Sequence, residues 1–173
     1  MLLVNEMKKI LLRVALIVAI VLWMVTIFSF SAETADASSA TSRGVIKTFV
    51  KFLYSDFESL SAEQQFELVS GWQGFVRETA HLAEYAILGF LVSGFMATLE
   101  VKRAVQFSVP PLWCLAYAVT DEVHQLFVDG RAFQLLDLLF DCAGGILGTA
   151  ALFILILLVS KAREKKNGKK NNS

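Results

Sequence analysis

The chain has 173 residues, a length for one domain, and more than half of them are apolar, with a mean hydropathy of +0.58. Its 16 basic and 16 acidic residues give a net charge of zero. This composition indicates a membrane protein and excludes an ordinary soluble domain.

Four apolar segments set the expected fold. They cover residues 10–30, 80–98, 104–120 and 135–160. Three of them are long enough to cross a hydrocarbon core of about 30 Å at a rise of about 1.5 Å per residue. The third, 104–120, is shorter and contains Pro110 and Pro111, which favour a kinked or partly embedded helix. We expect an all-α, polytopic membrane protein with about four transmembrane helices in one domain, residues 1–160.

The N-terminal segment has two interpretations. Lys8 and Lys9 precede an apolar run, and the sequence Ala35-Asp36-Ala37 follows it, as in a cleavable signal peptide. The apolar run is longer than the core of most signal peptides. We therefore expect the first transmembrane helix to remain uncleaved.

A polar and amphipathic segment separates the first two transmembrane helices. Residues 28–42 are rich in Ser, Thr and Ala, which predicts a loop or a surface that hydrogen-bonds another group. Residues 45–57 have apolar side chains at helical spacing, which predicts an amphipathic helix on the membrane surface. A capping box at Ser61 and Gln64 predicts a second such helix over residues 62–77.

Basic residues set the expected orientation. With the N-terminus in the cytoplasm, eleven of the sixteen lysines and arginines fall on the cytoplasmic side, against three acidic residues. Because lysine and arginine in short loops determine topology, we expect both termini on the cytoplasmic side of the cell membrane. The basic residues 161–173 predict a disordered topology anchor in preference to a nucleic-acid-binding arm, so we expect no nucleic-acid partner.

Ionisable residues gather at the ends of the apolar segments. His81, Glu84 and Tyr85 share one face of the second helix, because they are three and four residues apart. The turn after the third helix carries Arg131. The other polar residues, at the end of the third helix and the start of the fourth, are Asp121, Glu122, His124, Gln125, Asp137 and Asp141. In the expected topology all of these residues lie at one depth, just inside the outer face of the bundle.

Small residues predict where helices and turns approach closely. Gly89 and Ser93 on the second helix, and Gly144 and Gly148 on the fourth, form small surfaces suited to helix contact. Gly130 lies in the expected turn before Arg131, where glycine is free to adopt a positive φ.

Three interpretations of the polar residues remain open. In the first, ion pairs lock the helices together and burial keeps some carboxyl groups neutral. In the second, the residues bind a metal, but two histidines without an H-E-x-x-H motif are a weak signal, and we expect neither a metal nor a cofactor. In the third, they line a polar pocket that binds an amphiphilic ligand and acts on it by acid–base chemistry.

Three segments resemble a known family. FSFSAETADASSATS, VRETAHLAEYAILGFL and DEVHQLFVDGRAFQLLDLLFDCAGGILG are similar, in this order, to motifs of the VanZ-like membrane proteins, over about residues 23–148. The resemblance implies a small polytopic membrane protein. The member that gives the family its name lowers susceptibility to teicoplanin, with little effect on vancomycin. The residues carried over from the family motifs are Ser31, His81, Glu84, Tyr85, Asp121, Glu122, His124, Gln125, Arg131, Asp137 and Asp141. Glu78 departs from the pattern, which has a basic residue at this position in many relatives.

The residues and the resemblance together predict a protein of the cell envelope. We expect it to reduce susceptibility to teicoplanin-type lipoglycopeptides by binding or modifying an amphiphile, either a lipid or the acyl tail of a lipoglycopeptide, at the outer-face polar site. The alternative is a non-catalytic membrane partner of the cell-wall synthesis proteins, with structural buried charges. Catalysis stays open, because Ser31 in a serine-rich segment is a weak candidate for a nucleophile.

Overall fold

A computed structural model describes residues 2–171 of the chain, and the side chains of residues 3–167. The elements in chain order are α1 (Leu2–Ser31), α2 (Ala35–Leu53), the short 3₁₀ helix η1 (Phe57–Ser59), α3 (Ala62–Ala97), α4 (Arg103–Gln125) and α5 (Leu135–Asn171). No strand occurs among residues 2–171. The all-α prediction is therefore confirmed.

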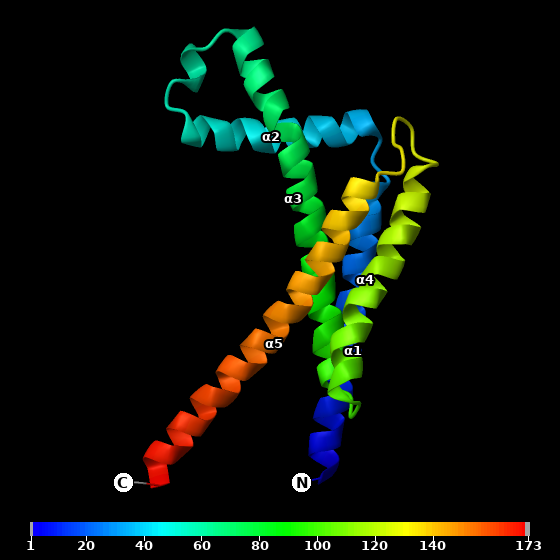
Figure 1. Cartoon of the computed structure of the whole chain (residues 1–173), viewed down its shortest axis with the longest axis vertical. Helices are drawn as coiled ribbons and strands as arrows, with labels where there is room; N and C mark the ends of the chain where they lie inside the picture. The colour runs from blue at the N-terminus through cyan, green and yellow to red at the C-terminus, as the bar shows by residue number, and fades with distance from the viewer. Residues whose placement is uncertain (1, 172–173) are drawn as a thin grey trace.

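Four long helices form a bundle that is capped at one end (Figure 1). α1, α3, α4 and the first half of α5 run side by side, and α2 lies across the end where α1 stops and α5 starts. Both chain termini lie at the opposite end, and α5 inclines away from its neighbours as it approaches that end. We call the end covered by α2 the α2 end of the bundle.

The helices identify a multi-pass membrane protein. α1, α3 and α5 are each long and apolar enough to cross a bilayer. α4 runs the length of the bundle but is not among these three, because polar residues lower the hydropathy at both of its ends, with Arg103 and Gln106 at one end and Asp121 and Glu122 at the other. Pro110 and Pro111 do not interrupt α4, which is continuous from Arg103 to Gln125.

The prediction of a separate surface helix over residues 62–77 is wrong. The capping box forms, with the Ser61 side chain accepting from Gln64 and the Gln64 side chain accepting from Ser61, but the helix that it opens continues through the membrane segment to Ala97. Neither Gly71 nor Gly74 ends the helix. No proline follows them within α3, so the backbone hydrogen bonds of the helix can continue. The first turns of α3 thus extend beyond the α2 end (Figure 1).

The other helix boundaries also differ from the expected ones. α1 starts at Leu2, well before residue 10, and α2 starts at Ala35 and takes in most of the serine-rich segment. The Thr34 side chain accepts a hydrogen bond from the Ala37 backbone N–H (3.3 Å) and so caps the first turn of α2. The amphipathic segment after residue 45 is therefore the second half of a longer helix, which packs Ile46 and Val50 against α3.

The expected disordered tail, residues 161–173, is helical as far as Asn171, and its last two residues lie outside the described chain. Alanine, lysine, arginine and glutamate have high helix propensity, and the segment contains no proline. Helix α5 can therefore continue past the apolar residues into the basic ones.

Glycines allow α3 and α5 to touch along their backbones, as the small-residue pattern predicted. A Cβ atom on Gly148 would overlap the carbonyl oxygen of Ala86, and one on Gly144 would overlap that of Leu82. Next to Gly148, the Thr149 Oγ1 accepts a hydrogen bond from the Ser93 hydroxyl (3.1 Å). This close contact fixes α3 and α5 relative to each other and so positions the polar residues that both helices carry at the α2 end.

Candidate functional site

Polar residues from every helix converge at the α2 end of the bundle. α1 ends at Ser31, α4 ends at Gln125, and α5 begins two residues before Asp137. The α4–α5 loop turns at Gly130, whose φ of 72° only glycine adopts readily, and this confirms the predicted turn. The Asp129 carbonyl accepts from the Ala35 backbone N–H (3.2 Å) and docks the loop on the start of α2. These contacts place Arg131 beside α2.

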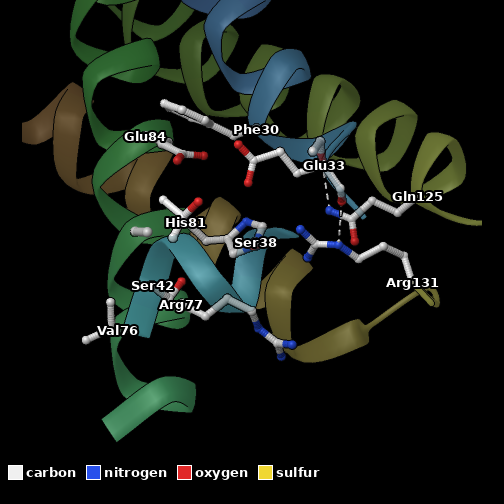
Figure 2. Close-up of a pocket in the computed structure, with 13 residues that line it drawn as sticks. Phe30, Glu33, Ser38, Ser42, Val76, Arg77, His81, Glu84, Gln125 and Arg131 are labelled. Atoms are coloured by element: carbon white, nitrogen blue, oxygen red, sulfur yellow. Dashed lines mark hydrogen bonds between the residues drawn. The ribbon is translucent and has the colours of Figure 1, made fainter. Parts of the chain in front are cut away.

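A cavity of about 180 Å³ opens among α1, α2, α3 and the α4–α5 loop (Figure 2). Five of the predicted site residues line it, and they are Ser31, His81, Glu84, Gln125 and Arg131. The same wall contains apolar side chains, among them Phe30 and Val76. We call this space the histidine cavity. It combines ionisable groups of both signs with apolar surface, as ligand sites commonly do.

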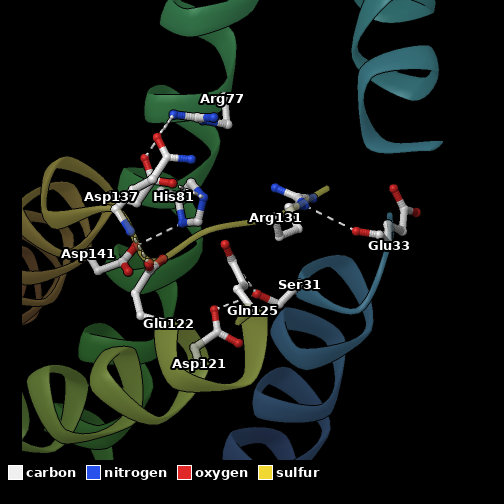
Figure 3. Close-up of polar contacts among 11 residues, drawn as sticks. Ser31, Glu33, Arg77, His81, Asp121, Glu122, Gln125, Arg131, Asp137 and Asp141 are labelled. Atoms are coloured by element: carbon white, nitrogen blue, oxygen red, sulfur yellow. Dashed lines mark hydrogen bonds and ion pairs between the residues drawn. The ribbon is translucent and has the colours of Figure 1, made fainter. Parts of the chain in front are cut away.

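His81 is held between two aspartates of α5 (Figure 3). Its Nδ1 lies 3.1 Å from Asp141 Oδ1, and its Nε2 lies 3.7 Å from Asp137 Oδ2. Both carboxylates are fully buried, with no exposed surface. The pairs join residues far apart in the sequence and fix the imidazole ring at the wall of the histidine cavity.

Arg77 and Glu122 bind the start of α5 from two sides. The Nη2 of Arg77 donates to Gln134 Oε1 (2.6 Å) and to Asp137 Oδ1 (3.3 Å). Glu122 Oε2 accepts from the Gln134 backbone N–H (2.7 Å). Glu122 therefore caps the end of the α4–α5 loop and does not face the histidine cavity.

Ser31 connects α1 to α4. Its hydroxyl donates to Asp121 Oδ2 (2.7 Å) and accepts from Gln125 Nε2 (2.8 Å). All three side chains are buried. Because the hydroxyl hydrogen points at a carboxylate and the oxygen receives an amide N–H, Ser31 acts here as a hydrogen-bonding bridge between two helices.

Replacing Ser31 by alanine is expected to lower the free energy of unfolding by about 1–3 kcal/mol, because Asp121 and Gln125 both lose a buried partner. Thermal unfolding of the purified protein in detergent micelles would measure the loss. Ser29→Ala is the matched control, since the Ser29 hydroxyl is exposed and bonds only to the Val25 carbonyl of its own helix. Equal melting temperatures for the two variants would contradict the bridging role.

Six predicted residues do not line the histidine cavity, and they are Tyr85, Asp121, Glu122, His124, Asp137 and Asp141. Tyr85 is fully buried near Tyr117, and His124 stacks on Phe28 with 4.3 Å between the ring centroids. The structure thus brings all eleven predicted residues to the α2 end of the bundle. Within the cavity it exposes five of them.

The sequence prediction missed several residues that line the cavity, namely Glu33, Ser38, Thr41, Ser42 and Arg77. Arg77 precedes His81 by four residues, so the helical spacing placed both on one face. Ser38 and Ser42 have the same spacing in the serine-rich segment. The spacing of Ser38 and Ser42 is informative only if both residues lie in a helix. The sequence analysis left open whether this segment is a loop, so it did not place them on one face.

Comparison with known proteins places the chain in one family. A family model described as VanZ/LLP1 matches residues 16–158, most of the chain. No curated protein and no solved structure matches it.

Proposed function

Because the chain belongs to the VanZ/LLP1 family, we propose that it binds an amphiphile in the histidine cavity, at the outer face of the cell membrane. By binding or modifying this amphiphile it reduces susceptibility to teicoplanin-type lipoglycopeptides. The ligand is a membrane lipid or the acylated antibiotic itself. The observation that carries the proposal is a cavity of about 180 Å³ that presents His81, Glu84 and Arg131 beside apolar side chains.

The orientation rests on charge and on the positions of the termini. Both termini lie at the end of the bundle opposite the histidine cavity (Figure 1). Lys8, Lys9 and the basic residues after Lys161 belong to that end, and basic residues favour the cytoplasmic side. This orientation gives cytoplasmic termini and opens the cavity to the outer leaflet, where a lipoglycopeptide acts.

The polar atoms around the cavity favour binding over a purely structural role. Two buried atoms of side chains that line the cavity, Arg77 Nε and Gln125 Oε1, have no hydrogen-bond partner among the described residues. An unsatisfied buried polar group destabilises a protein by about 1–3 kcal/mol. Selection for stability alone would remove such groups, whereas a ligand site has a use for them.

A second candidate function is supported by the ion pairs between helices. His81 with Asp141, and Arg77 with Asp137, each link α3 to α5. If these links are only structural, the protein acts as a non-catalytic partner of the cell-wall synthesis proteins. In that case copurification with those proteins survives replacement of the cavity residues.

The proposed function is tested by the teicoplanin and vancomycin susceptibility of a glycopeptide-sensitive host that expresses the protein. We expect protection against teicoplanin and little against vancomycin. Glu84→Gln replaces the carboxyl group in the cavity by an amide and is expected to weaken ligand binding about tenfold, the effect of one strong hydrogen bond, with a matching loss of protection.

Glu67→Gln is the matched control, because Glu67 is exposed on the same helix, outside the cavity. Membrane levels of all variants are measured in parallel. A lack of protection by well-expressed wild-type protein would contradict the resistance role. Protection that follows only the amount of protein in each variant would favour the structural alternative.

A further inference from the structure

A second cavity of about 240 Å³ adjoins the histidine cavity, between α2, α3 and the α4–α5 loop. Its charged lining residues are Arg77 and Arg131, and both also line the histidine cavity. Serine hydroxyls and glutamine amides make up most of the remaining lining, and no carboxylate occurs among the described residues that line it. We call this space the arginine cavity. Its lining is suited to a negatively charged group.

Arg131 is positioned with free hydrogen-bond donors. Its Nε donates to the Glu33 backbone carbonyl (3.1 Å), which fixes the plane of the guanidinium group. Within residues 3–167 its two terminal nitrogens have no hydrogen-bond acceptor, and the side chain makes no ion pair. Figure 2 shows Arg77 and Arg131 entering this region from two elements, α3 and the α4–α5 loop. A guanidinium held in this way offers two parallel N–H donors to an oxyanion.

Helix α2 supplies neutral donors to the same space. Ser38 and Ser42 are one turn apart, so their hydroxyls lie on one face of the helix. Ser38 lies in the first turn of α2, and the N-terminal end of a helix carries a partial positive charge that favours anions. Gly130 also lines this cavity beside the start of α2, where a Cβ atom would lie 3.0 Å from the Ala35 side chain.

We propose that the arginine cavity binds a phosphate group, carried as the headgroup of an amphiphilic ligand. This inference rests on the proposed function and concerns the membrane lipid among its two ligands, since it names the headgroup of the lipid that occupies the adjoining histidine cavity. The free donors of Arg131 and the serine hydroxyls match the several acceptor oxygens of a phosphate, and Arg77, paired with Asp137, lies beside them. In the histidine cavity, the Glu33 carboxylate repels an anion. The phosphate therefore lies in the arginine cavity, and the rest of the ligand extends past His81 towards the apolar wall.

The test uses the full-length protein in nanodiscs of phosphatidylcholine. Three probes are added separately, namely inorganic phosphate, a short-chain phosphatidic acid and a phosphatidylcholine of the same chain length. Binding is measured from the rise in unfolding temperature with probe concentration. We expect phosphatidic acid to bind to the wild type more tightly than the matched phosphatidylcholine. Arg131→Gln is expected to weaken this binding about tenfold, as loss of a charge-assisted pair does.

Arg43→Gln is the matched control, because Arg43 lies on α2 and faces a different part of the surface. If Arg131→Gln fails to fold, the double variant Ser38→Ala/Ser42→Ala takes its place, with an expected loss of about fivefold. If inorganic phosphate competes with phosphatidic acid, the phosphate group alone is sufficient for binding. If phosphatidic acid binds and inorganic phosphate does not compete, the site requires a phosphate that is attached to a lipid. Both results support the inference.

Two results would overturn the inference. One is equal affinity of phosphatidic acid for the wild type and Arg131→Gln, and the other is no binding to the wild type. Teicoplanin susceptibility of the same variants separates this inference from the proposed function. Teicoplanin protection without phosphate binding would remove only the phosphate site, whereas arginine-dependent phosphate binding without protection would remove only the resistance role.

Discussion

Replacing Gly148 by alanine is expected to prevent α3 and α5 from packing and to leave little folded protein in the membrane. The added Cβ atom would overlap the Ala86 carbonyl oxygen, which belongs to the backbone and cannot rotate away. Overpacking of a core usually costs about 1–3 kcal/mol, and we expect a loss above that range because a backbone atom is the obstacle. The unfolding temperature in micelles and the amount of monodisperse protein would both measure the effect.

Gly71→Ala is the matched control for this prediction. Gly71 also lies within a long helix, but no atom lies within 4 Å of the position that its Cβ would occupy. Alanine has a higher helix propensity than glycine by about 0.8–1.0 kcal/mol, so this variant is expected to be unchanged or slightly more stable. Similar behaviour of the two variants would contradict the close contact between α3 and α5.

The second large effect is expected at Asp137. Replacing it by alanine removes the acceptor for Arg77 and the carboxylate that lies 3.7 Å from His81 Nε2. Breaking a buried ion pair costs about 3–5 kcal/mol, and we expect about 3 kcal/mol because the Arg77 side chain keeps 35% of its surface exposed. Chemical or thermal unfolding in micelles would measure this loss.

The ion pair of Lys51 with Glu58 supplies the control for Asp137. Both side chains are well exposed, and exposed pairs contribute little to stability. The hydrogen bond and the charge from Lys51 lower the pKa of Glu58, so any stabilisation is present at neutral pH and is lost as the pH falls through that lowered pKa. We expect Glu58→Ala to leave the unfolding temperature unchanged. A loss as large as that of Asp137→Ala would show that burial does not distinguish the two pairs.

The apolar periodicity of the sequence was sufficient to predict the helical class and the level at which the polar residues gather. His81, Asp137 and Asp141 lie together because α3 enters the bundle at the α2 end and α5 begins at the same end. The order of the helices along the chain is enough to predict this meeting. The small residues Gly144 and Gly148 also predicted a surface for helix contact on α5, and the structure shows that its partner is α3. These features follow from patterns within single segments.

The partners of individual side chains depend on how the helices rotate about their axes, which no local pattern contains. Arg77 could have faced the surface, and its contact with Asp137 depends on the approach that Gly148 allows. Ser38 and Ser42 became part of a cavity wall only because the Thr34 cap starts α2 at Ala35. The arginine cavity could therefore not be predicted from the sequence, because its residues come together only when the helices pack.

The most direct test of the account is a binding measurement with the full-length protein in nanodiscs, using teicoplanin and vancomycin as ligands. The account predicts that acylated teicoplanin binds, that vancomycin binds at least about tenfold more weakly, and that Glu84→Gln weakens teicoplanin binding while Glu67→Gln does not. Equal binding of both antibiotics to all variants, or no binding of teicoplanin to the wild type, would contradict the claim that the histidine cavity binds an amphiphile of this kind.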